Sequence, residues 1–354
     1  MTATEGDAGA EHAGDEHAGD GTGPAGSEPR SRPWVRWVRI VVSLALLAVL
    51  VTRLHFDELL PKHPGARTII ALACGIAVTF LGVVLSAWRW KRVLVTFEAP
   101  LPLRTLLSVY LAGMFLGNVL PSTIGGDVLR IKRCSDLTGS GEIGFGSVIL
   151  ERLTGWLALP VVSLTGFAID RSLVDEKHAW IAIWTSIGAL VLLFAILFLA
   201  GHPRLAGRFH GNENWTRFIG AVHFGVDRMR RHPRLALGVL VAALLYACST
   251  VVTVGLAVET LGLDIPTAAL VAYVPAVAML QVLPLSLSGL GIREGMLVLL
   301  LRPLGVSTGS AVAVGLLWYA MTVAVSLLGA PSLAIGTRRR PVSATAPPTP
   351  SDGH

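Results

Sequence analysis

Apolar residues along this chain gather in long runs that short polar segments separate. Six runs are long enough to cross a bilayer as helices, at about residues 35–54, 67–88, 143–169, 179–200, 236–258 and 308–336. Two further apolar stretches, at about 103–130 and 267–301, are interrupted by proline and glycine. The pattern predicts an all-α polytopic membrane protein with about six full transmembrane helices and two broken or re-entrant elements.

The two interruptions are copies of each other at a constant offset of 163 residues. The matching positions are Asn118–Pro121 with Gln281–Pro284, Gly126 with Gly289, Arg130 with Arg293 and, upstream, Tyr110 with Tyr273. A proline and glycine break at the same place in two halves of a membrane protein indicates a substrate site built from discontinuous helices. The chain is therefore expected to bind or move something inside a membrane.

Composition divides the chain into one membrane domain, at about 34–336, and two polar ends. The chain is 53% hydrophobic and 15% charged, whereas residues 1–33 are rich in glycine and acids. Such a segment buries too little apolar surface to fold, so residues 1–33 are predicted to be a disordered acidic tail. Residues 337–354 are predicted to be a second disordered tail, on the cytoplasmic side.

Lys and Arg residues predict the orientation of the spans. Basic residues occur before the first span, in the turn Arg89–Arg92, in the loop 201–234 and at Arg338–Arg340. We expect these segments, and both termini, to lie on the cytoplasmic side of a cell (inner or plasma) membrane. The loop 259–266 carries only acids and is expected outside. Three full spans separate the broken elements, so the second copy is predicted to be inverted relative to the first.

The loop 201–234 has an amphipathic segment of its own. Its apolar residues fall on one helical face: Trp215, Phe218, Ile219, Val222, Val226 and Met229. This pattern suits a helix lying in the headgroup plane, and it equally suits a soluble connector helix.

The residues at the two breaks form the first group of candidate binding residues. A helix that restarts after a proline presents unpaired backbone N–H groups, which stabilise a phosphate, and a nearby arginine can clamp that phosphate. The candidates are Asn118, Ser122, Thr123, Gly126, Asp127 and Arg130 at the first break, and Gln281, Ser286, Ser288, Gly289, Arg293 and Glu294 at the second. Two of these residues have an alternative interpretation. Arg130 could be an ordinary cytoplasmic anchor, and Glu294 could simply neutralise Arg293.

Glu151 and Arg152 form the second group, because both lie well inside an apolar span. Charges at that depth are costly and mark a functional site by default, although a purely structural buried pair remains an alternative. Adjacent helix positions do not face each other, so each residue is expected to have a partner elsewhere. The candidates are Arg130 or Arg293 for Glu151, and Asp127 or Glu294 for Arg152.

Several function classes are disfavoured by what the sequence contains. All ten histidines fall outside the predicted spans, and the three cysteines form no metal-binding or disulfide pattern. No nucleotide-binding loop, soluble catalytic domain or nucleic-acid module is recognisable. We therefore expect a protein that is not an enzyme, with no catalytic residues, no metal, no cofactor and no nucleic-acid partner. Transport, if present, is downhill, ion-coupled or driven by a partner.

These motifs resemble those of the lysylphosphatidylglycerol synthase transmembrane region, also called the flippase-like domain family, over nearly all of residues 35–336. The matching positions are Pro121, Gly126, Arg130, Glu151, Arg152, Gly289, Gly291, Arg293 and Glu294. The resemblance implies a polytopic domain that, in the best-understood members, carries a modified phospholipid between leaflets. Two positions depart from this pattern. Asp127 stands where glutamate is more usual, and Gly155 stands where an aspartate commonly follows the Glu–Arg pair. The cytosolic synthase domain has no counterpart here, so synthase activity is not expected.

The expected function is that of a lipid translocase or flippase-like transporter for a membrane phospholipid or lipid-linked substrate. Arg130 and Arg293 are expected to hold phosphate, while Glu151 and the Ser/Thr-lined turns accept hydrogen bonds from the headgroup. One alternative is a membrane-embedded transferase or the membrane partner of a separate synthase or transferase. Another is a non-catalytic, lipid-sensing scaffold in which the charges are structural.

Overall fold

The computed structural model describes residues 65–119, 125–201, 213–282 and 289–335, and every regular element in them is a helix. The predicted span 35–54, both predicted tails and the candidates Ser122, Thr123, Ser286 and Ser288 lie outside the described residues.

Among the described residues, five helical segments are long and apolar enough to cross a membrane. They are α2 (Ala66–Thr96), α5 (Gly141–Ile169), α6 (Ala179–Gly201), α9 (Pro233–Thr260) and Thr308–Leu333, which comprises α12 (Thr308–Ser326), η5 (Leu327–Gly329) and most of α13 (Ala330–Ile335). The prediction of an all-α polytopic membrane protein is confirmed. One boundary was wrong, because α2 continues eight residues beyond the predicted end at 88.

Both predicted interruptions separate two helices. The first lies between α3 (Leu103–Val119) and α4 (Gly125–Thr138), and the second between α10 (Thr267–Leu280) and α11 (Ile292–Leu301). Gly289 and Gly291 precede α11 with φ angles of 77° and 83°. L-residues with side chains avoid this left-handed region, so glycine allows the chain to turn into α11.

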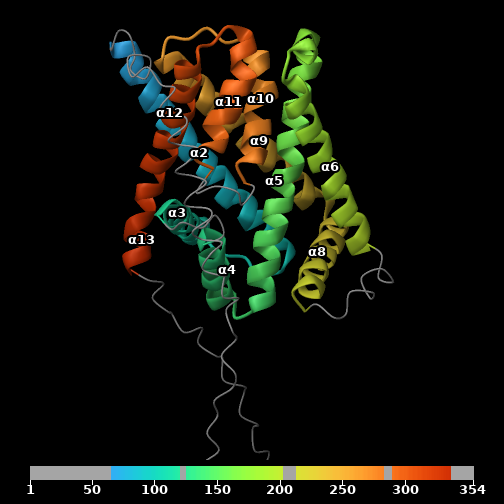
Figure 1. Cartoon of the computed structure of the whole chain (residues 1–354). Coiled ribbons are helices and arrows are strands. Elements are labelled where there is room, and N and C mark those ends of the chain that lie inside the picture. Colours follow the sequence, from blue (N-terminus) through green and yellow to red (C-terminus); the bar gives the residue numbers. More distant parts are fainter. Residues whose placement is uncertain (1–64, 120–124, 202–212, 283–288, 336–354) are drawn as a thin grey trace, which may run out of the picture.

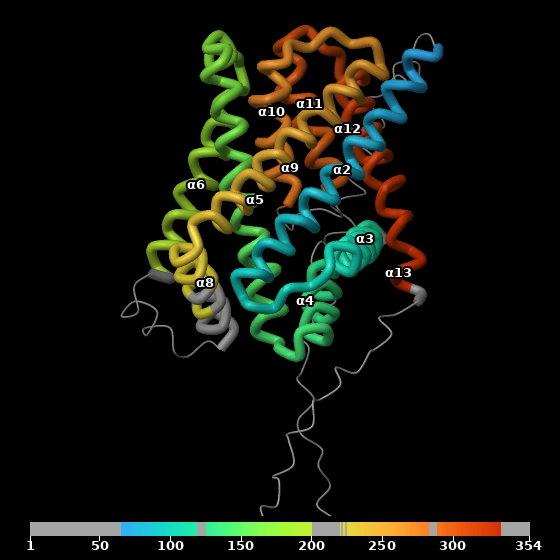
Figure 2. Tube along the Cα trace, turned by 180° about the vertical axis from the view of Figure 1, so that it is seen from behind, coloured from blue at the N-terminus to red at the C-terminus, as the bar shows by residue number. Residues whose placement is uncertain are grey.

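The two copies occupy opposite ends of the molecule. The pair α3–α4 lies in the lower half of Figure 1 and the pair α10–α11 in the upper half, and Figure 2 shows the same separation from behind. Whether the second copy is inverted relative to the first stays a prediction. The helix α8 (Glu213–Arg231) and the end of α13 lie at the same end as α4.

Glycines bring α4 very close to both of its neighbours. A Cβ added at Gly126 would collide with the backbone oxygen of Gly113 on α3, and one added at Gly144 of α5 would lie 2.8 Å from the Ile131 oxygen. A Cβ at Gly113 would also lie 2.9 Å from Cγ of Arg130. Because Gly113 has no side chain, the stem of Arg130 fits between α3 and α4.

The amphipathic segment forms α8, as predicted, and packs against the protein. Val222 is fully buried among residues of α5 and α6, including Leu153 and Ile196. Arg228 donates to the Thr96 carbonyl oxygen at 3.1 Å and to Glu98 Oε1 at 2.6 Å. The helix therefore connects the end of α2 with α5 and α6. Whether it also lies in the headgroup plane stays a prediction.

Candidate functional site

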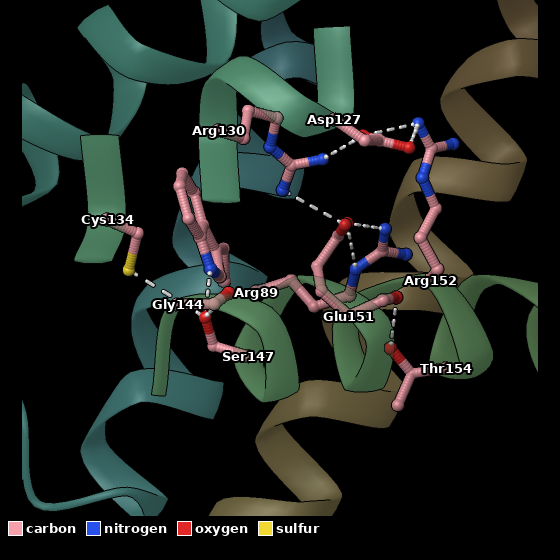
Figure 3. Close-up of polar contacts among 10 residues, drawn as sticks. Arg89, Asp127, Arg130, Cys134, Gly144, Ser147, Glu151, Arg152 and Thr154 are labelled. Atoms are coloured by element: carbon pink, nitrogen blue, oxygen red, sulfur yellow. Dashed lines mark hydrogen bonds and ion pairs between the residues drawn. The ribbon is translucent and has the colours of Figure 1, made fainter. Parts of the chain in front are cut away.

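The carboxylate of Glu151, on α5, lies at the centre of a buried charge network (Figure 3). Its Oε2 accepts from Arg130 Nη2 at 3.1 Å, and its Oε1 accepts from Nε of Arg89 at 3.1 Å and also from Arg89 Nη2. Glu151 is only 1% exposed. Two guanidinium groups compensate the cost of burying this charge, and the pairing with Arg130 confirms one of the two predicted partners.

Arg89 was placed wrongly by the sequence analysis, which assigned it to a basic cytoplasmic turn. The residue lies within α2 and its side chain is buried. Its guanidinium is bound to Glu151, which compensates the cost of burying the charge. Its neighbour Trp90 is also fully buried. One sequence signal was available, since apolar residues resume at Val93–Val95 after the basic residues and continue the helix.

A second carboxylate links Arg130 to Arg152 (Figure 3). Asp127 Oδ1 accepts from Arg130 Nη1 at 3.2 Å, and Arg152 Nη2 lies 2.7 Å from Asp127 Oδ2 and 2.8 Å from Oδ1. The pairing of Arg152 with Asp127 was one of the two predicted alternatives and is confirmed. The Arg152 side chain is 45% exposed, whereas that of Arg130 is 3% exposed. Arg152 is therefore the more accessible cation of this pair.

Aromatic rings fix the plane of the Arg130 guanidinium. Its Cζ lies 4.5 Å from the ring centroid of Trp90 and 4.3 Å from that of Tyr110. Trp90 is itself held by a hydrogen bond from its Nε1 to Ser147 Oγ at 3.1 Å. Cation–π contacts and ion pairs thus hold Arg130 in one position.

The second copy uses a different arrangement. Arg293 donates to Glu294 Oε1 from Nε at 3.1 Å and from Nη2 at 2.7 Å, and Glu294 Oε2 accepts from the Gly291 backbone N–H at 2.7 Å. A carboxylate at a helix N-terminus is favourable, so Glu294 both caps α11 and orients Arg293. The Arg293 guanidinium also lies 4.8 Å from the ring centroid of Tyr319 on α12.

A cavity of about 480 Å³ lies between the two copies. Its wall contains both members of two repeat pairs, Asn118 with Gln281 and Arg130 with Arg293. The other wall residues among the candidates are Gly126, Asp127 and Arg152, joined by Arg89. The structure therefore brings most of the described candidates to one site.

Three candidates do not line this cavity. Glu151 and Glu294 are both buried behind the arginines that they bind, and Gly289 packs against Gln281. These positions suggest that the two glutamates orient arginines rather than contact a ligand. Among the described residues, no group of three or more His, Cys, Asp and Glu side chains is arranged to hold a metal ion.

The helices and the cavity define a multi-pass membrane protein with a charged central site. Residues 36–329 match the family model of the lysylphosphatidylglycerol synthase TM region, and the chain belongs to this family. The resemblance seen in the sequence motifs is thereby confirmed. No curated protein matches the chain.

The structure also shows the surroundings of Gly155. A Cβ added at Gly155 would lie 3.3 Å from Arg89 Nη1. That nitrogen has no hydrogen-bond partner among the described residues. Because Gly155 has no side chain, it offers this buried guanidinium donor no partner.

Proposed function

We propose that this protein is a flippase-like lipid translocase that binds the headgroup of a phospholipid or lipid-linked substrate in the central cavity. The observation that carries the proposal is that one cavity is lined by both copies of the repeat, through Arg130 and Arg293. Inverted repeats with broken helices around a central site are typical of transporters that alternate access by rocking one repeat against the other.

The charges around the cavity support an anionic ligand group. Arg130 and Arg293 are held in fixed positions by carboxylates and aromatic rings, which lowers the entropy lost when they bind a phosphate. The carboxylates Asp127, Glu151 and Glu294 are engaged by arginines, which disfavours their use as general bases. We accordingly propose a transporter rather than an enzyme.

We also propose that the end carrying α4, α8 and α13 faces the cytoplasm of a cell membrane, with both termini on that side. The basic residues Arg228, Arg230 and Arg231 lie on α8. At the opposite end, Glu259 lies in the last turn of α9 and Asp264 lies in the loop between α9 and α10 (Figure 2). The positive-inside rule assigns the basic end to the cytoplasm.

The test is lipid movement in proteoliposomes that contain a headgroup-labelled phospholipid, measured by protection of the label from an impermeant quencher. Wild-type protein should move the lipid between leaflets, and Arg293→Ala should abolish movement in protein that still folds, with a lower unfolding temperature because Glu294 loses its buried partner. Arg302→Ala is the matched control, because Arg302 is exposed and lies just after α11. Normal transport by Arg293→Ala would refute the assigned role.

One observation favours a second candidate, a lipid-sensing scaffold or the membrane partner of a separate synthase or transferase. Arg130 and Arg293 are both paired in the protein, as structural charges would be. Native mass spectrometry of wild type and of the Arg130→Ala/Arg293→Ala variant separates the two. A lipid class lost only from the variant supports the translocase site, whereas identical, unselective lipid in both supports the scaffold.

A further inference from the structure

We infer that the headgroup bound in this cavity is a phosphate bearing an uncharged, hydroxyl-rich terminal group, such as glycerol, inositol or a sugar, and not an aminoacyl group with a free ammonium. The inference rests on the proposed function, since it names the substrate class of the same cavity.

Among the described residues, the buried side-chain atoms of the cavity wall that lack a hydrogen-bond partner are all donors. Arg89 Nη1, Arg130 Nε and Asn118 Nδ2 are buried without a hydrogen-bond partner among the described residues, and all three residues line the cavity. Such donors are satisfied by water or by acceptor atoms of a ligand, so a ligand that displaces the water must bring acceptors to avoid leaving them unpaired. Phosphate and hydroxyl oxygens are acceptors, whereas an ammonium group has three donors and no acceptor.

The charge of the wall points in the same direction. Among the described residues, the wall carries four arginines (Arg89, Arg130, Arg152 and Arg293) and a single acid, Asp127. Both oxygens of Asp127 are already bound by arginines. An ammonium in this cavity would find no free carboxylate, and the arginines would repel it.

Aromatic rings are a further class of group that binds ammonium ions in proteins. Among the described residues, four of the five aromatic rings of the wall already face guanidinium groups: Tyr110 that of Arg130, Tyr246 that of Arg89, and Trp318 and Tyr319 that of Arg293, whereas Trp156 does not. The cation–π sites of these four rings are therefore occupied by the protein itself.

A strip of hydroxyl groups on α2, α9 and α12 offers the complementary surface for a polyol. Its members are Thr79, Ser249, Thr250, Thr253 and Thr322. Thr79, Ser249 and Thr322 donate to carbonyl oxygens of their own helices, at 2.8, 2.7 and 2.9 Å. Their remaining lone pairs are acceptors for ligand hydroxyl groups, and they carry no charge that could compensate an ammonium.

The positions of these groups along α2 match a phosphate with an extended substituent. Thr79 and Arg89 both line the cavity and lie ten residues apart on one helix, which corresponds to about 15 Å along its axis. A phosphate at the arginines thus leaves space for a terminal polyol towards the hydroxyl strip.

The test compares lipids of identical acyl chains by native mass spectrometry of the full-length protein in nanodiscs. The probes are phosphatidylglycerol, phosphatidylinositol, phosphatidic acid, phosphatidylethanolamine and lysylphosphatidylglycerol. We expect the two polyol lipids to bind at least tenfold more tightly than the two amine-bearing lipids, with phosphatidic acid between them. Equal or tighter binding of an amine-bearing lipid would overturn the inference and leave the proposed function standing. Unselective binding, together with no lipid movement in proteoliposomes, would overturn both.

Gly155 offers a charge test with a matched control. Gly155→Asp places a carboxylate beside the unpaired Arg89 Nη1, whereas Gly155→Asn adds nearly the same volume without charge. We expect Gly155→Asp to shift the ratio of lysylphosphatidylglycerol to phosphatidylglycerol binding about tenfold towards the amine-bearing lipid, relative to Gly155→Asn. Equal ratios for the two variants would show that wall charge does not select the headgroup.

The hydroxyl strip is tested separately by Thr253→Val, which keeps the shape of the side chain and removes its hydroxyl group. This variant should narrow the preference for phosphatidylinositol over phosphatidic acid severalfold. An unchanged preference, in a variant with wild-type thermal stability, would overturn the role of the strip.

Discussion

Arg130 Nη2 donates to Glu151 Oε2 at 3.1 Å and joins two helices, α4 and α5, that border the cavity. Neither side chain is more than 3% exposed. Because Glu151 also binds Arg89 of α2, one carboxylate connects three helices. The arrangement makes Glu151 the residue on which the positions of two cavity arginines depend.

Glu151→Gln should therefore destabilise the protein strongly. Removing one partner of a buried ion pair costs roughly 3–5 kcal/mol, because the remaining charge is left uncompensated in a medium of low dielectric constant. The measurement is unfolding by denaturant in detergent, with Glu142→Gln as the control because Glu142 is exposed in the first turn of α5. Equal stability of the two variants would contradict the proposed dependence.

Gly126→Ala should displace α4 from α3. The added methyl group would overlap the backbone oxygen of Gly113, which cannot move aside like a flexible side chain. We expect a loss of roughly 1–3 kcal/mol, as for other overpacked contacts, and weaker lipid binding because Arg130 moves with α4. Gly295→Ala is the control, since a Cβ at Gly295 has no neighbour within 4 Å. A stable Gly126→Ala variant with normal lipid binding would show that α4 tolerates the shift.

Arg152→Gln should weaken lipid binding with little effect on stability. Its side chain is 45% exposed and lines the cavity, and Asp127 keeps its hydrogen bond from Arg130 when Arg152 is lost. A hydrogen bond to a charged group contributes about 1.5–3 kcal/mol, so phosphatidylglycerol affinity should fall at least tenfold. Titration by native mass spectrometry checks this value, and Arg230→Gln on the exposed surface of α8 should bind as the wild type does. A lower free energy of unfolding for Arg152→Gln, with unchanged affinity for phosphatidylglycerol, would instead indicate a structural role.

Cysteine accessibility should show the orientation of the inverted repeat. In a background without the native cysteines, Arg230→Cys at the end of α8 should react with an impermeant thiol reagent only after the cells are permeabilised. Asp264→Cys, between α9 and α10, should react in intact cells. Both positions are exposed, and the helix α8 and the connection between α9 and α10 lie towards opposite ends of the molecule (Figure 2). The reverse pattern would place the basic end outside and refute the proposed orientation.

Much of the fold was predictable because a bilayer imposes simple rules on sequence. Backbone groups within hydrocarbon must be paired, so each span is a long apolar segment that forms a helix. A proline or a pair of glycines then marks where a helix ends. This explains why the ends of α3 and α10, the starts of α5 and α12 and the amphipathic α8 lie close to their predicted positions. The end of α2 was predicted too early because Arg89 and Arg92 resemble a cytoplasmic anchor. In the structure, Glu151 neutralises Arg89 inside the protein and the helix continues.

The candidate site was predicted less completely, since side-chain pairing depends on how helices pack. The sequence reduced the partners of Glu151 and Arg152 to two each, and the structure selected Arg130 and Asp127. It could not reveal Arg89, which lies 62 residues from Glu151 and reaches it only because α2 crosses α5. It also placed Glu151 and Glu294 among ligand contacts, whereas both carboxylates are turned towards arginines.

The sequence by itself determined that this chain spans a membrane several times, that it contains a repeated pair of interrupted helices, and that charged residues lie unusually deep in its spans. Those properties follow from local composition and period, which the hydrocarbon core selects directly. Only the tertiary structure decided that both copies of the repeat face one cavity and that four arginines but a single acid line its described wall. The reason is physical: a guanidinium group moves several ångströms on its flexible stem, so packing between distant helices determines whether it meets a carboxylate or remains available to a ligand.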